Sequence, residues 1–148
     1  MNVTDTLTGE HCVFHLLIEQ LDDAAPRCRT IEELRSAAAP LAISLLGHAQ
    51  IEEATLFTPL ERRIGTAGPL HCLREEHQTM DRLLRALFRL PDLEVTRQAV
   101  RDVLDVTRGH LAKEEQVLFE VARTALQATD LQELGAEWAR ARGIALPE

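Results

Sequence analysis

The sequence predicts an all-α protein, an up-down-up-down four-helix bundle built from two repeated helical hairpins with a short C-terminal fifth helix. Three observations support this fold class. Good helix formers (Leu, Ala, Glu and Arg) dominate the 148 residues, and residues typical of strands are scarce, with no Tyr, one Trp and four Phe. Apolar residues recur at helical spacing in most of the chain. The two halves of the chain also repeat one two-helix unit.

Length and charge restrict the class of protein further. A chain of 148 residues is typical of one domain, so residues 1–148 are treated as a single domain. The net charge of −8, without a basic stripe, disfavours nucleic acid as a partner. No apolar run approaches the ~20 residues of a membrane span. The segment MNVTDTLTGEH lacks the pattern of a signal peptide, so a cytoplasmic location without a membrane partner is expected.

The internal repeat has two matching segments in each half. GHAQIEEATLF (47–57) matches GHLAKEEQVLF (109–119), and both read G-H-x-x-x-E-E-x-x-L-F. Upstream, EHCVFHLLIEQL (10–21) aligns with EHQTMDRLLRAL (76–87). Each half therefore carries E-H on its first helix and H-x-x-x-E-E on its second.

The first hairpin begins with a helix predicted over residues 8–24, followed by a turn over residues 22–29. The second helix opens at Thr30, because Glu33 three residues later completes a capping box. This helix is predicted to end near Ile64. Two prolines inside it are expected to kink or shorten the helix. They are Pro40 and Pro59.

The second hairpin follows a linker over residues 65–69. Its first helix is predicted over residues 69–90 and starts with a proline, which suits the first helical position. After a Pro-Asp turn, the second helix is predicted over residues 93–128. A short fifth helix over residues 130–142 ends at Gly143.

Four histidines, one on each main helix, are predicted to lie at one depth of the bundle. A similar number of residues separates each histidine from the turn of its hairpin. On the second and fourth helices, a glutamate four residues after the histidine shares its face, and apolar neighbours indicate that this face points into the core. The six residues are His11, His48, Glu52, His77, His110 and Glu114.

These six side chains predict a metal site. Buried imidazoles and carboxylates without partners would be very costly, and metal ions remove that cost. A lone buried histidine is usually a satisfied core residue, but here the pattern recurs in register across the repeat. Imidazole and carboxylate without thiolate suit iron, manganese or zinc. Six protein ligands are too many for one tetrahedral zinc ion, so two ions bridged by the two glutamates fit better.

Neighbouring titratable residues offer alternatives. His15 lies four residues after His11 and can share its inward face, which makes it an alternative fifth ligand. Its repeat counterpart, Asp81, breaks the symmetry. Glu53 and Glu115 lie about 100° around the helix from the ligand glutamates and are expected at an interface or in solvent. The alternative is that they accept a hydrogen bond from a ligand histidine.

This motif set resembles the hemerythrin-like, HHE cation-binding domains over nearly the whole chain. The resemblance implies a four-helix bundle that holds two iron ions, oxo- or hydroxo-bridged, with Glu52 and Glu114 bridging. Oxygen-carrying hemerythrins have a fifth histidine four residues before the third-helix ligand, where this chain has Leu73. The sequence is therefore closer to the four-His, two-Glu domains involved in iron sensing and iron–sulfur repair.

The resemblance implies a non-haem di-iron protein that binds or reduces a small ligand such as O2, NO or H2O2. Whether it is an enzyme is left open, with catalase- or peroxidase-like or NO/O2-reactive oxidoreductase activity as the candidates. One alternative is an iron-handling protein that donates iron, as the iron–sulfur repair type does. Another is an iron or oxygen sensor module that acts through a protein partner.

Overall fold

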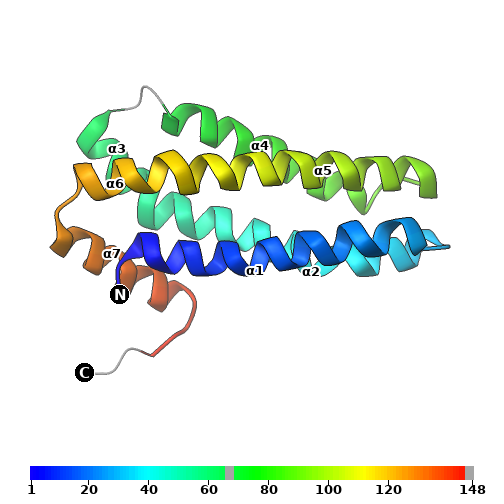
Figure 1. Cartoon of the computed structure of the whole chain (residues 1–148), viewed down its shortest axis with the longest axis horizontal. Coiled ribbons are helices and arrows are strands. Elements are labelled where there is room, and N and C mark those ends of the chain that lie inside the picture. Colours follow the sequence, from blue (N-terminus) through cyan, green and yellow to red (C-terminus); the bar gives the residue numbers. More distant parts are fainter. Residues whose placement is uncertain (66–68, 146–148) are drawn as a thin grey trace.

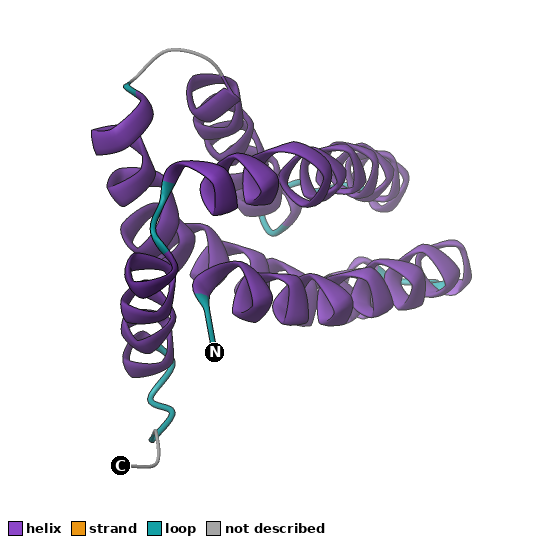
Figure 2. Ribbon diagram, turned by 60° about the vertical axis from the view of Figure 1, so that its left-hand side comes forward, coloured by secondary structure: helices purple, strands orange, loops and turns teal. Residues whose placement is uncertain are grey.

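The computed structural model describes residues 1–65 and 69–145. Within these ranges every regular element is a helix, which confirms the predicted all-α class. The long helices run along the long axis of the molecule, and a short last helix lies across one end, near the N-terminus (Figures 1 and 2). No helix in the described ranges is long and apolar enough to cross a membrane.

The first hairpin consists of α1 (Val3–Ala24), α2 (Ile31–Glu52), a π-helical turn (Glu53–Phe57) and α3 (Thr58–Ile64). Helix α1 begins earlier than residue 8 because the side chain of its N-cap, Asn2, accepts the backbone N–H of Asp5 at 3.0 Å. The capping box predicted at the start of α2 is present. Pro40 lies inside α2 without ending it, and Pro59 falls in the first turn of α3, where proline is tolerated.

The second hairpin consists of α4 (Pro69–Leu87), α5 (Leu93–Lys113), a π-helical turn (Glu114–Leu118) and α6 (Phe119–Ala125). Helix α4 ends before residue 90, and the last main segment ends before residue 128. Residues 66–68 of the predicted linker lie outside the described residues. Helix α7 (Ala128–Ala141) follows, and Gly143 stops it with a φ of 69°.

Both halves carry a π turn at the repeated glutamate, where the sequence predicted uninterrupted α-helix. The turns span Glu53–Phe57 and Glu114–Leu118. A π turn closes its hydrogen bonds from i to i+5, so the residue five positions after the glutamate comes to lie near the same face. Phe57 and Phe119 stand at this spacing from Glu52 and Glu114, and both rings are fully buried.

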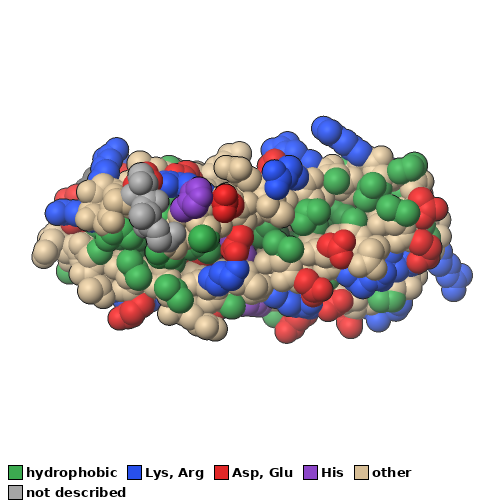
Figure 3. Space-filling view, turned by 90° about the horizontal axis from the view of Figure 1, so that it is seen from above, with side chains coloured by type: hydrophobic (Ala, Val, Ile, Leu, Met, Phe, Trp, Pro, Cys, Tyr) green, Lys and Arg blue, Asp and Glu red, His purple; other side chains and the backbone are tan. Residues whose placement is uncertain are grey.

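Two apolar clusters fill the bundle on either side of the histidine level. One lies toward the hairpin turns and includes Phe14, Leu45 and Leu84. The other lies toward the end covered by α7 and includes Leu7, Phe57 and Trp138. The six predicted ligands therefore sit between two layers that exclude water. On the surface seen from above, acidic and basic side chains are intermixed (Figure 3), so the negative net charge does not gather in one patch of that face.

Helix α7 packs closely on the N-terminus through Gly135. A Cβ added at Gly135 would lie 3.0 Å from the Met1 carbonyl oxygen and 3.0 Å from the Asn2 carbonyl carbon. Gly135→Ala should therefore lower the free energy of unfolding by about 1–3 kcal/mol through overpacking. Gly9→Ala in α1 is the matched control, because nothing lies within 4 Å of its added Cβ, and it should be neutral or stabilising. Denaturant unfolding of both variants tests this, and equal effects would contradict it.

Candidate metal centre

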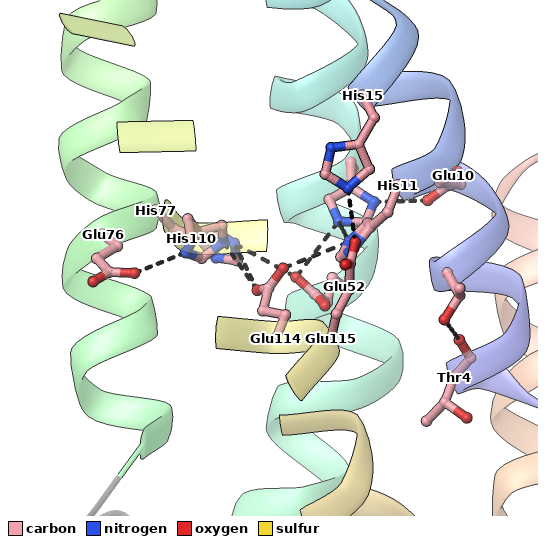
Figure 4. Close-up of polar contacts among 12 residues, drawn as sticks. Thr4, Glu10, His11, His15, Glu52, Glu76, His77, His110, Glu114 and Glu115 are labelled. Atoms are coloured by element: carbon pink, nitrogen blue, oxygen red, sulfur yellow. Dashed lines mark hydrogen bonds and ion pairs between the residues drawn. The ribbon is translucent and has the colours of Figure 1, made fainter. Parts of the chain in front are cut away.

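The structure brings the six predicted residues together at one depth of the bundle (Figure 4). Their ligand atoms form two groups, each with all atoms within 4.8 Å of one another. Each group contains two histidines, and both groups share Glu52 and Glu114. The first pair is His11 and His48, and the second pair is His77 and His110. This arrangement fits two adjacent cations with the glutamates between them.

Glu114 lies between the two histidine pairs and directs one oxygen to each. Its Oε2 atom is 3.5 Å from Nε2 of His11. Its Oε1 atom is 2.9 Å from Nε2 of His110 and 3.6 Å from Nε2 of His77. Glu52 spans the pairs with a single oxygen, because its Oε2 atom is 3.7 Å from Nε2 of His48 and 3.5 Å from Nε2 of His77.

Three carboxylates outside the ligand groups, here called the outer carboxylates, fix the tautomer of three imidazoles. The Nδ1 atom of His11 is 3.0 Å from Glu115. The Nδ1 atom of His48 is 2.7 Å from Glu10, and that of His110 is 3.0 Å from Glu76. Because a carboxylate only accepts hydrogen bonds, each Nδ1 donates its proton outward. Each Nε2 then presents a lone pair to the interior, which is the tautomer that binds a metal ion.

The interior of the cluster consequently holds acceptors that face other acceptors. Both carboxylate oxygens of Glu52 and of Glu114 are buried without a hydrogen-bond partner, as is Nε2 of His110. The Nε2 atoms of His11 and His48 face one another at 3.2 Å. Unpaired buried acceptors are costly, and a cation is the group that satisfies lone pairs from several directions at once. The residues present therefore fit a metal pair.

The electrostatics of the cluster favour an added positive charge. Burial, reinforced by the negative charge of Glu114, raises the pKa of Glu52 well above its usual value. Burial also raises the pKa of Glu114 to about 8. Burial and repulsion from neighbouring imidazoles lower the pKa of His11 to about 2 and that of His77 to about 3. Without cations the site resists charged carboxylates and charged imidazoles alike, and cations make the ionised carboxylates favourable.

Two of the outer carboxylates form ion pairs with basic side chains. Glu10 pairs with Arg142, which immediately follows α7, at 2.5 Å. Burial alone would raise the pKa of Glu10, but the hydrogen bond from His48 and the charge of Arg142 outweigh it, and the pKa is lowered. Glu76 pairs with Lys113 on the neighbouring helix α5. These ion pairs keep the carboxylates ionised, so they remain acceptors for the imidazole protons.

The three titratable residues that neighbour the ligands in the sequence, His15, Glu53 and Glu115, have different surroundings. The His15 side chain is 46% exposed, and its Nε2 atom lies 3.1 Å from Glu115, outside both ligand groups. Glu115 takes the role given above as an alternative, because it accepts from His11. Glu53 instead accepts from Arg74 at 2.8 Å. These two glutamates, equivalent in the repeat, therefore have different partners.

Four residues of the site carry no specific prediction from the sequence. Glu10 and Glu76 precede the histidine in the repeated E-H pair, which predicts a ligand only at the histidine. The aromatic residues are the final Phe of each repeated motif. Phe57 stacks on His77, with ring centroids 5.2 Å apart and an interplanar angle of 17°. Phe119 packs on His11, with centroids 5.3 Å apart. All four residues recur at equivalent positions in the repeat, and this repetition is the sequence signal that could have indicated a role in the site.

The raised pKa of Glu114 predicts a pH-dependent stability of the metal-free protein. A carboxyl whose pKa is raised from 4.5 to about 8 by folding stabilises below pH 4.5, and this contribution is lost as the pH rises to 8. Glu114→Gln removes the titration. It should be nearly neutral at pH 4 and stabilising, on the order of a few kcal/mol, at pH 9.

Denaturant unfolding of chelator-treated protein at the two pH values measures this effect. Glu120→Gln is the control, because this glutamate is largely exposed on α6, and it should show no such difference. An equal effect of Glu114→Gln at both pH values would contradict the raised pKa.

Comparisons with known proteins agree with the site. The model of the hemerythrin HHE cation binding domain matches residues 2–122. A protein of Nostoc sp. (strain PCC 7120 / SAG 25.82 / UTEX 2576) named DNA nickase is 24% identical over 143 residues, which cover 96% of this chain and 39% of that protein. The chain thus spans less than half of the length of that relative. The name DNA nickase applies to the relative. No solved structure gives a significant match.

The family match and the geometry concern the same residues. The matched range contains both halves of the repeat and all six residues of the two ligand groups. The shared glutamates, the inward-facing Nε2 atoms and the outer carboxylates form a cation-binding site in a helical bundle. The chain belongs to the hemerythrin HHE cation-binding domain family.

Proposed function

We propose that this protein is a non-haem di-iron protein that binds or reduces a small ligand such as O2, NO or peroxide. The observation that carries the proposal is the pair of ligand groups that share both glutamates. Two cations in such groups are close enough to act on one small ligand together. A single ion in one group would leave the two imidazoles of the other group without a metal ion.

The roles of the residues follow from their positions. His11 and His48 would hold one iron, His77 and His110 would hold the other, and both groups share Glu52 and Glu114. A bound iron pair supplies redox equivalents and coordination positions for the small ligand. Four imidazole nitrogens and four carboxylate oxygens fall short of the about twelve donors that two octahedral ions take, so positions remain for an exogenous ligand.

The surrounding residues orient the ligands and exclude water. The outer carboxylates set the tautomer and direction of three imidazoles, which raises their basicity toward a metal. The rings of Phe57 and Phe119 cover two imidazoles on the side of α7. The apolar cluster toward the hairpin turns closes the opposite side. A small ligand would therefore react in a dry site, where electrostatic interactions are strong.

A second candidate is an iron-handling or sensor role exerted through a protein partner. The observation in its favour is the link from Nδ1 of His48 through Glu10 to Arg142. This link ties one ligand to the residue that follows α7. A partner that contacts α7 would be sensitive to whether the site holds metal.

Metal content tests the di-iron site directly. The iron-loaded protein should contain two irons per chain, and Glu52→Ala or Glu114→Ala should each reduce this number, because each removes a shared ligand. Glu53→Ala is the matched control, since this neighbouring glutamate pairs with Arg74 and not with a ligand histidine. Elemental analysis after desalting gives the count. One iron at full loading would contradict the bridged arrangement.

Reactivity tests the class of ligand. The reduced, iron-loaded protein should change its visible absorbance rapidly when mixed with O2, NO or H2O2, because open positions remain on the iron pair. The change should be lost in Glu114→Ala and kept in Glu53→Ala. Stopped-flow absorbance with each of the three ligands identifies the one that reacts fastest. An iron pair inert to all three would favour the iron-handling or sensor role.

A further inference from the structure

The two halves of the repeat agree in their inward-facing residues but differ at the outer sides of the cluster. On the side of α1 and α5, His11 is fully buried. Its Nδ1 atom lies 3.0 Å from Glu115, and the exposed side chain of His15 lies 3.1 Å from the same carboxylate oxygen. Three polar side chains and their helices therefore close this side of the cluster (Figure 4).

The equivalent side between α2 and α4 is open. A cavity of about 520 Å³ lies there, and its walls are mostly apolar. It reaches the imidazole of His77, whose side chain is 11% exposed. The residues that line it include Ala49, Glu53, Arg74 and Met80. A concave apolar site with a few polar groups is the usual form of a small-molecule pocket.

Two residues that line this cavity are smaller than their counterparts in the repeat. Ala49 stands where the other half has Leu111, and Met80 stands where it has Phe14. Leu111 and Phe14 are both buried, and the Phe14 ring packs on His48 with centroids 4.9 Å apart. The smaller Ala49 and the unbranched Met80 line the cavity between α2 and α4. The two halves therefore differ in side-chain size at two positions near the cluster.

Arg74 adds a third difference. In the other half, the glutamate after the shared glutamate accepts from a ligand histidine, as Glu115 does from His11. Here Arg74 holds Glu53 with donors at 2.8 and 3.0 Å and holds Glu61 at 2.6 Å, and the repeat counterpart of this arginine is Thr8. Within the described residues, no carboxylate is hydrogen-bonded to Nδ1 of His77. Glu53 thus lines the cavity as an acceptor for Arg74 and not for a ligand histidine.

We propose that this cavity is the ligand-access site of the metal pair. Small, weakly hydrated molecules enter it and first reach the metal position held by His77 and His110, while the position held by His11 and His48 is closed. The ligand class is a neutral diatomic molecule or a small linear anion, since the apolar walls disfavour larger hydrated ions. This inference rests on the proposed di-iron function and deepens it.

Ala49→Leu tests the proposal, because it places the leucine of the other half into the cavity. Ala37→Leu is the matched control, since it is the same change on the same helix and lines a separate cavity of about 220 Å³ near Pro40. Iron is counted first in each protein. Azide is then mixed with the oxidised, iron-loaded protein, and its binding is followed by stopped-flow absorbance. Met80→Phe provides a second closing variant if Ala49→Leu does not fold.

The expected result is two irons in every variant, with azide association slowed at least about tenfold by a closing variant and changed by less than about twofold in Ala37→Leu. Two irons with an unchanged azide rate in the closing variants would overturn the access site alone. Two irons with no azide spectrum in the unmutated protein would also overturn it. Fewer than two irons in the unmutated protein would overturn the proposed function itself.

Discussion

The structure depends on one electrostatic constraint, which is that two carboxylates and four imidazoles share a dry volume in which every inward atom is an acceptor. Such a group needs positive charge at its centre, either from cations or from protons on the carboxyl groups. The outward hydrogen bonds from Nδ1 of three imidazoles leave their Nε2 lone pairs facing inward, which increases this need. The ion pairs of Glu10 and Glu76 with basic residues keep these outer carboxylates ionised as acceptors.

The relative placement of the six ligands was predictable because it depends on geometry within single helices. A histidine and a glutamate four residues apart share a face in any α-helix, and similar distances to the hairpin turns bring four helices into register. Because the same histidine and glutamate pattern occurs in both halves of the chain, a coincidental pattern in one helix could be excluded. By contrast, Glu115 and Glu53 have identical local sequence patterns, yet only Glu115 reaches a ligand histidine. Arg74, which lies on another helix, holds Glu53 and makes the difference. A sequence pattern within one helix cannot predict a contact with another helix.

The backbone departures from prediction have separate physical reasons. The π turns after the histidine–glutamate pairs shift hydrogen bonds by one residue, and no composition marks such a shift. The apolar periodicity places Leu56 and Leu118 in the core under either geometry, so it could not reveal the turns. The early start of α1 depends on the Asn2 cap, which lies upstream of the first periodic apolar residues used to place the helix. Helix ends are set by such single hydrogen bonds.

The ion pair between Arg142 and Glu10 has a consequence for where the domain ends. The family model matches residues 2–122. The Glu10 carboxylate, which accepts the hydrogen bond from His48, is nevertheless held by Arg142, twenty residues downstream of that range. Trp138 and Leu134 of α7 also complete the apolar cluster beneath the site. A protein trimmed to the matched range would keep all six ligands and lose an electrostatic anchor of one of them. The structural unit that supports this metal centre is therefore larger than the range that the family model matches.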